Sequence, residues 1–454
     1  STAHQPLFRC SSFLACAMSF DYQLFRRMSI LGMKLDRFEI ELDNSENAYF
    51  AGQEISGKII IDAPEPKRIN EILLELKGRC RTQWTKHSGK SRKHCNNSEP
   101  YFLEQFNTAY THKFAEHEDK DRILPSGHHE IPFSYTLPKS LPSSFEGDHG
   151  FVRYTCRAIC ERPWDFDIVS RTAFTVVGIE DINCDPVLSE PATVAESNQT
   201  VAAICWKASG SIQAELSLTK TGYTPGEMIE ASAKVQNSSN KARKVSLKLT
   251  QHVTYKAKTF AGHEQAKTTK KQILRKEFGE AGANSSFDVV LERLRLPSLP
   301  PKLGRCKSIH LNYTVDLEVE GTVTASVPIV VGTIPLLADL LTHSKQSTAR
   351  NNGNSLSLTH KNSMPVDDSI VQVTITDEDG QTTTDDAMSN ELDALLSARK
   401  RVRMPSSILS ELYPTMPSPY YRESFFGKTD ISDEKETVQF GENQFAPKYP
   451  FYTD

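Results

Sequence analysis

The stretch LPSSFEGDHGFVRYTCRAICERPWDFDIVSRTAFTVV, residues 141–177, decides the fold. Within residues 151–160, apolar residues and cysteines occupy alternate positions and mostly polar residues fall between them. This period of two predicts a strand that is buried on one face. Glycines provide a tight reversal before the strand, and Pro163, which cannot donate to a sheet ladder, ends it. A second strand is predicted over residues 172–177, and periodicity alone fits any β-hairpin equally well.

Upstream of this stretch, three short strands are predicted in succession. Residues 38–42 alternate apolar and acidic side chains, and residues 55–61 place Ile55, Gly57, Ile59 and Ile61 on one face. Residues 69–77 place isoleucine and leucines at every second position. Turn-forming residues separate the segments. Short alternating strands with turns between them are typical of a β-sandwich.

Residues 79–99 interrupt this pattern with a run of lysines, arginines and polar residues. Two interpretations are open: a solvated loop that links two strands, or an anion-binding patch. The loop is favoured, because runs of charged residues usually face water.

The same pattern occurs twice in the chain. Residues 49–53 (YFAGQ) match residues 223–227 (YTPGE), 174 positions later, and the isoleucine strand after the first turn aligns with Ile229, Ala231, Ala233 and Val235. Each half closes on Val-Val-Gly, at residues 176–178 and 330–332. A period this long indicates a duplicated domain, since solenoid units repeat every 20–50 residues. The sequence therefore predicts an all-β chain with two tandem immunoglobulin-like β-sandwiches.

Composition narrows the function classes. A chain of 454 residues with 38% hydrophobic and 24% charged residues has room for two or three globular domains. A net charge of −4 gives no general reason to expect nucleic acid as a partner. No apolar run is long enough for a membrane span, so any membrane association would be peripheral. Nine cysteines without a C-x-x-C pair indicate reduced thiols in a cytoplasmic protein.

No motif indicates catalysis, so the chain is not predicted to be an enzyme. The sequence contains no G-x-S-x-G, no glycine-rich phosphate loop and no H-E-x-x-H. A zinc site would have to combine adjacent or strand-bound residues: His128, His129, His149, Cys156 and Cys160. Structural zinc sites show paired short spacings instead, so buried thiols are the better interpretation and no metal or other cofactor is predicted.

Both ends of the chain differ from the middle. Residues 1–32 are interpreted as a disordered or artefactual extension, and residues 336–454, rich in Ser, Thr, Asn and Asp, as a mostly disordered tail. Such a tail can present short linear motifs. One predicted clathrin-adaptor sorting motif contains Tyr413 and Met416, and an acidic-dileucine motif contains Glu391, Leu395 and Leu396. Both patterns are degenerate, so an amphipathic turn or coincidence explains them as well.

Several sequence motifs of this chain resemble those of one family, the α-arrestins or arrestin domain-containing proteins. The motifs are LPSSFEG and ERPW in residues 141–164, DIN at 181–183, GYTPGE at 222–227, LPSLPP at 296–301 and PIVVGTIP at 328–335. The resemblance covers about residues 34–335. It implies an arrestin-like N-domain over residues 33–178, a linker over 179–208 and an arrestin-like C-domain over 209–335.

The resemblance also implies a function. An α-arrestin would be a non-catalytic adaptor that binds membrane receptors or transporters and links them to endocytic sorting and ubiquitin-ligase machinery. Such an adaptor would be cytoplasmic and recruited to the plasma membrane and endosomes. Its tail would carry Pro-Pro-x-Tyr motifs for WW domains of HECT-type ligases. Here Pro419 with Tyr421 and Pro447 with Tyr449 lack the first proline, which weakens the expectation of ligase recruitment.

One departure from the family pattern and two alternative functions remain. Residues 38–44 lack the lysine pair with which visual and β-type arrestins detect receptor phosphates, so phosphorylation-triggered activation does not carry over. One family relative acts through a mixed disulfide with thioredoxin, which makes Cys184, Cys205 and Cys306 unranked candidates for a redox-sensitive regulator. A retromer-like coat subunit of the same fold is the third alternative. The sequence does not identify the cargo.

Overall fold

The structure is a computed structural model, and it describes residues 35–88, 91–114, 122–163, 165–198, 210–337, 413, 419–432 and 438–452. Their regular structure is β apart from three short 3-10 helices: η1 (Tyr110–Lys113), η2 (Ile182–Cys184) and η3 (Pro186–Ser189). No helix in these ranges is long and apolar enough to cross a membrane. The described residues up to Pro335 and from Pro419 onward belong to one compact unit. The prediction of an all-β fold is confirmed.

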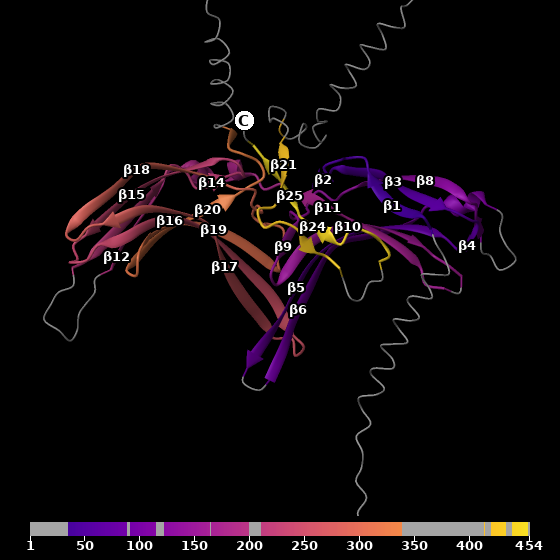
Figure 1. Ribbon diagram of the computed structural model, residues 1–454, viewed down its shortest axis with the longest axis horizontal. Coiled ribbons are helices and arrows are strands. Elements are labelled where there is room, and N and C mark those ends of the chain that lie inside the picture. The colour runs from indigo at the N-terminus through magenta and orange to yellow at the C-terminus, as the bar shows by residue number, and fades with distance from the viewer. Residues whose placement is uncertain are drawn as a thin grey trace, which may run out of the picture. The chain divides into compact units, whose positions relative to one another are not determined.

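The first sandwich consists of two β-layers (Figure 1). One layer has the order β1 (Arg37–Leu42), β3 (Glu54–Ala63) and β8 (Gly127–Thr136). The other has the order β6 (Ser91–Asn107), β5 (Ile72–Ser88), β10 (Gly150–Cys160), β11 (Ile168–Val177) and β2 (Ala48–Phe50). Alternate side chains of both layers enter a shared core, which β1 joins through Phe38, Ile40 and Leu42.

The second sandwich repeats this arrangement. One layer has the order β12 (Ala192–Asn198), β13 (Ile212–Leu218), β15 (Met228–Asn237) and β18 (Ser285–Arg295). The other contains β14 (Gly222–Tyr223), β20 (Val323–Val331), β19 (Ile309–Val319), β16 (Arg243–Thr259) and β17 (Glu264–Ala281). Two tandem β-sandwiches were predicted, and the structure has them.

The duplication predicted from the sequence is visible in matching details. β3 and β15 both contain ten residues and begin 174 positions apart. The turns that precede them place Gly52 at φ 86° and Gly226 at φ 99°, a left-handed conformation that glycine adopts without strain. In each copy a buried tyrosine hydroxyl donates to a proline carbonyl 2.7 Å away: Tyr154 to Pro142 and Tyr313 to Pro300. These tyrosines fasten the strand to the loop that enters it.

The decisive strand is β10. Its burial alternates as predicted, with Val152 and Tyr154 among the fully buried residues. Tyr154 lies opposite Gly78 of β5, where a Cβ atom would come within 2.7 Å of the tyrosine ring. Only glycine leaves room for this ring. β11 begins at Ile168, four residues before the predicted start, because the apolar residues 168 and 169 already pair with β10.

The prediction of a solvated loop over residues 79–99 is wrong. β5 and β6 continue through this segment as one antiparallel hairpin, in which Cys80, Thr82 and Trp84 are buried. Arg79 and Arg81 alternate with these buried residues on the other face, but basic and polar residues occupy both faces near the end of the hairpin, which concealed the period of two. The hairpin reaches the second sandwich, where Asn96 pairs with Lys258 of β16. A single sheet therefore runs through both sandwiches.

The predicted linker, residues 179–208, also needs a correction. It contains η2, η3 and the strand β12, which pairs with β13 along its whole length. β12 buries none of its residues fully, because it is an edge strand, and this removed the hydrophobic pattern on which the assignment depended. The remaining small strands of the first sandwich are β4 (Lys67–Ile69), β7 (Arg122–Leu124) and β9 (Phe145–Gly147).

Candidate functional site

The carboxy-terminal segment is where the predicted motifs and the fold meet. Residues 419–432 and 438–452 form β21 (Tyr420–Glu423), β22 (Thr429–Asp430), β23 (Phe440–Gly441), β24 (Gln444–Phe445) and β25 (Lys448–Phe451). β21 pairs with β25, and β22 with β24. The tail over residues 336–454 was predicted to be mostly disordered, and these two stretches of it are strands. The polar composition of the preceding residues dominated the composition of the whole tail, so the aromatic residues of these stretches did not change the prediction.

Tyr449 anchors this segment to the first sandwich. Its side chain has no exposed surface, and its hydroxyl donates to the Ser144 carbonyl at 3.0 Å. Burial raises the pKa of this phenol well above its ordinary value. The neighbouring backbone N–H of Lys448 donates to the Thr175 hydroxyl at 3.0 Å. Full burial of a tyrosine ring together with a satisfied hydroxyl is typical of a core contact.

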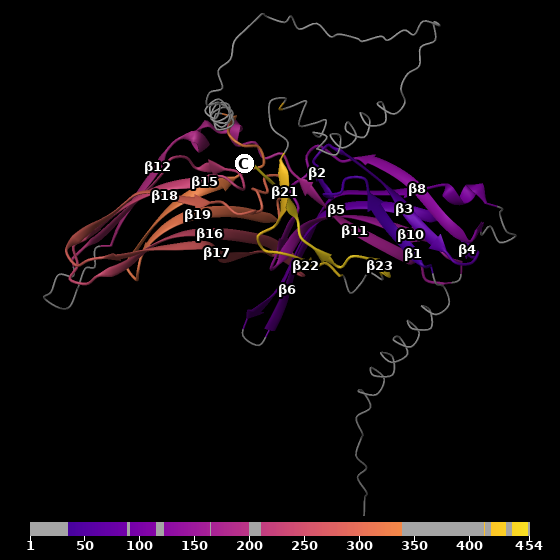
Figure 2. The same ribbon diagram turned by 45° about the horizontal axis from the view of Figure 1, so that its top comes forward.

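β23 extends this contact along β11. Phe440 pairs in parallel with Ser170 of β11, and Figure 2 shows the ribbon of β23 at the first sandwich. The Phe440 ring meets the Phe38 ring edge to face, with 6.2 Å between centroids. Just before β23, the Gln439 side-chain oxygen accepts the backbone N–H of Val169 at 2.8 Å. The segment thus covers part of an edge of the first sandwich.

The same segment contacts the second sandwich. The backbone N–H of Phe425 donates to the Ser298 carbonyl at 2.8 Å. Tyr452 donates its hydroxyl to the Thr333 carbonyl at 2.8 Å and its backbone N–H to the Pro225 carbonyl at 3.3 Å. One stretch of chain, more than eighty residues beyond the second sandwich, therefore bonds to both copies of the duplicated domain.

Both proline–tyrosine motifs lie in this docked segment. Pro419 is buried and Tyr421 is half-buried, with its ring 6.4 Å from that of Phe50. Pro447 and Tyr449 are buried, and the pairing of β21 with β25 brings the two motifs side by side. Of the predicted sorting motifs, Tyr413 is described and half-buried. Met416, Glu391, Leu395 and Leu396 lie outside the described residues.

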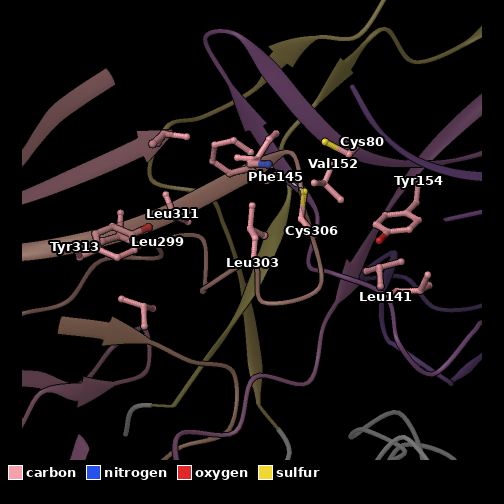
Figure 3. Packing of buried hydrophobic residues seen from close by; sticks show 14 of the residues in the cluster. Cys80, Leu141, Phe145, Val152, Tyr154, Leu299, Leu303, Cys306, Leu311 and Tyr313 are labelled. Carbon is pink, nitrogen blue, oxygen red and sulfur yellow. Dashed lines mark hydrogen bonds between the residues drawn. The ribbon is translucent and has the colours of Figure 1, made fainter. Parts of the chain in front are cut away.

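A second cluster joins the two sandwiches directly. The ligand atoms of Cys80, Glu99 and Cys306 lie within 4.8 Å of one another, and Figure 3 shows both thiols among buried side chains. This is the one group in the described part of the chain with enough donors for a metal ion. The Glu99 carboxylate already accepts hydrogen bonds from the Ser308 hydroxyl at 2.8 Å and from the Ser308 backbone N–H at 3.2 Å. Its observed role is to hold the loop before β19.

The two thiols of this cluster differ in acidity. The pKa of Cys306 is lowered to about 7, chiefly because the Cys80 S–H donates to it, and the pKa of Cys80 is raised by the same bond. The backbone N–H of Ile309 also donates to the Cys306 sulfur, at 3.3 Å. This pair could not be found from the sequence, because its members are 226 positions apart and share no motif.

The other residues considered in the sequence do not form a site. Cys156 and Cys160 are buried in β10, as predicted, and burial raises the pKa of both thiols. His128 contacts Asp62 and Glu130, and no histidine belongs to a potential metal-binding group among the described residues. Cys184 is exposed, and Cys205 lies outside the described residues.

Comparison with known proteins identifies the family. The family model "Arrestin (or S-antigen), N-terminal domain" matches residues 38–183, and "Arrestin (or S-antigen), C-terminal domain" matches residues 208–336. The chain is 63% identical to arrestin domain-containing protein 17 of Caenorhabditis elegans over 93% of this chain and the whole relative. It is 26% identical to mouse arrestin domain-containing protein 4 over 64% of this chain and 70% of the relative, and 24% identical to the human protein 4 over 64% and 70%. The duplicated sandwiches, both domain matches and these relatives together show that the chain belongs to the arrestin domain-containing family, the α-arrestins.

Proposed function

We propose that this chain is a non-catalytic adaptor that links membrane receptors or transporters to endocytic sorting and ubiquitin-ligase machinery. Family membership supports an adaptor role. In this proposal residues 33–178 and 209–335 hold the cargo, and the carboxy-terminal segment recruits WW domains. The protein acts from the cytoplasm at the plasma membrane and endosomes.

One observation supports a coupling between cargo binding and ligase recruitment. The segment that contains the two proline–tyrosine motifs is docked on both sandwiches. A WW domain binds an extended proline-containing ligand whose tyrosine enters an aromatic pocket. Pro447 and Tyr449 are buried, so they reach such a pocket only after β25 leaves the sandwiches. WW binding is then weakened by the fraction of molecules that remain docked. A partner that occupies the sandwiches and displaces the segment would strengthen ligase recruitment.

The test measures binding of a purified WW-domain array from a HECT ligase to the full chain. Phe440→Ala removes the contact with Phe38 but leaves both motifs intact, so we expect it to bind the WW array more tightly than the unmodified chain. Combining Phe440→Ala with Tyr421→Ala and Tyr449→Ala should abolish that gain. Val290→Ser, at an exposed position of β18, is the control.

Equal WW binding by the unmodified chain and all variants would refute the ligase part of the proposal. The cargo part has its own readout. Proximity labelling in cells, with and without residues 419–452, should recover membrane receptors or transporters in both cases and ligases mainly when this segment is present. Absence of membrane proteins from both samples would refute the adaptor function itself.

A further inference from the structure

Two hairpins, one from each sandwich, end next to each other. The β5–β6 hairpin and the β16–β17 hairpin are joined by the pairing of Asn96 with Lys258 and Cys95 with Thr259. The Lys86 ammonium of the first hairpin also donates to the Gln265 side chain of the second, at 2.9 Å. We call residues 85–88, 91–94 and 256–267 the paired tips (Figure 1).

The paired tips are strongly basic on an acidic chain. They contain six cationic side chains and one carboxylate, that of Glu264, which gives a net charge of +5 with histidines neutral. The whole chain has a net charge of −4. The six cations are Lys86, Arg92, Lys93, Lys256, Lys258 and Lys267. All but Lys267 are exposed, and no carboxylate within the described residues forms an ion pair with any of the six.

An unprotected aromatic ring lies at the turn of the second hairpin. Phe260 exposes 106% of its reference area, the largest value among the exposed large apolar residues of the described chain. It directly follows Lys258 and Thr259, at the level where β16 meets β6. A phenylalanine ring this exposed leaves its whole apolar surface in water, so its burial against an apolar layer would be favourable in free energy.

We propose that the paired tips bind an anionic lipid surface, with Phe260 inserted among the headgroups and the lysines facing lipid phosphates and carboxylates. The inference deepens the proposed function and rests on it, because an adaptor for membrane cargo has to reach the bilayer. Stable peripheral binding takes two signals, and the paired tips provide both: buried apolar area and basic charge.

Two features favour a lipid surface over an acidic protein or a nucleic acid. Five of the six cations are lysines, whose mobile ammonium groups suit a diffuse layer of charge, whereas arginine forks suit fixed carboxylates and phosphates. Phe260 projects from a turn and lies in no pocket formed by its neighbours, so a soft surface covers it without a complementary cavity. Lysines from both sandwiches contribute, so the surface exists only when the two hairpins are paired.

Co-sedimentation of the purified full chain with vesicles tests the proposal. We expect binding to phosphatidylcholine vesicles that contain phosphatidylserine, little binding to phosphatidylcholine alone, and a decrease as salt shortens the screening length. Lys256→Glu with Lys258→Glu should lower the partition coefficient by at least about tenfold, given the usual contribution of each cation near an anionic bilayer. Phe260→Ser should lower it by about tenfold through lost apolar burial.

Matched variants give the controls. Val290→Ser removes an exposed apolar residue on β18. Lys234→Glu with Lys241→Glu reverses two exposed lysines, one on β15 and one before the start of β16, whose other end carries the tip. Both should bind vesicles like the unmodified chain, and all variants should keep its melting temperature.

Three results would overturn the proposal: equal binding to neutral vesicles, unchanged binding by the tip variants, or complete competition by soluble glycerophosphoserine. Binding of a poly-glutamate peptide without binding to vesicles would assign the tips to an acidic protein instead. None of these measurements involves cargo or a ligase, so they can fail while the proposed function stands, and the reverse is also true.

Discussion

The two sandwiches share a frame and differ at their edges. Both copies fasten a buried tyrosine to a proline carbonyl, and both build the same ten-residue strand after a glycine turn. In the first copy, β23 of the carboxy-terminal segment pairs with the edge of β11. The second copy instead contributes loop carbonyls that accept hydrogen bonds from that segment. The core of a duplicated domain has kept its packing, while its edges have taken on separate partners.

Breaking the shared frame should have the largest effect. Tyr154→Ala and Tyr313→Ala each remove a fully buried ring and leave a cavity, so we expect each to lower the free energy of unfolding by about 4 kcal/mol. Urea denaturation followed by fluorescence measures this. Val290→Ala, at an exposed site, should change stability by less than about 0.5 kcal/mol. A loss below about 1 kcal/mol in one copy would show that the two tyrosines are not equivalent anchors.

Removing the anchor of the docked segment should have a smaller, local effect. Tyr449→Ala is expected to weaken docking by about 3 kcal/mol while both sandwiches stay folded. Hydrogen exchange should then speed up in β21 and β25 and stay unchanged in β10 and β19. Tyr420→Ala, in the same segment at a largely exposed position, is the control. Equal acceleration in the sandwich strands would mean that the segment does not dock separately.

The hydroxyl groups sharpen the comparison between the copies. Tyr154→Phe removes one hydrogen bond, to Pro142, and should cost about 1 kcal/mol. Tyr313→Phe should cost about 2 kcal/mol, because the Tyr313 hydroxyl also accepts the buried amide of Gln251 at 3.0 Å. Adding Gln251→Leu to Tyr313→Phe should restore part of the loss, since the unpaired amide disappears. Equal losses for the two tyrosines in denaturation experiments would contradict this reasoning.

The smallest expected effect concerns the thiols between the copies. Thiolate is the reactive form, so alkylation of Cys306 should rise steeply as the pH passes its pKa of about 7. Cys80→Ala removes the donor that stabilises the thiolate, which raises the pKa of Cys306 and moves the alkylation profile to higher pH. Mass spectrometry of peptides alkylated at several pH values measures this, with Cys156→Ala as the control. An unmoved profile would show that Cys80 does not influence Cys306.

Local patterns in the sequence predicted the frame well. β10 alternates because one of its faces is buried, and a repeated glycine turn marks the start of β3 and of β15. Prediction failed at 79–99, at 192–198 and in the carboxy-terminal segment. In two of these cases the strand is stabilised partly by a distant partner, β6 by β16 and β23 by β11, whereas β12 is an edge strand without a fully buried residue. Such a partner replaces the hydrophobic period that prediction depends on.

The sequence by itself determined the all-β class, the duplication and the family, because period-two burial and turn chemistry are properties of neighbouring residues. Only the tertiary structure decided that Cys80 meets Cys306, that the proline–tyrosine motifs are docked, and that two basic hairpins end together at Phe260. These contacts join residues that are remote in the chain. Their free energy comes from burial and hydrogen bonds completed across the fold, which leave no periodic trace in the sequence.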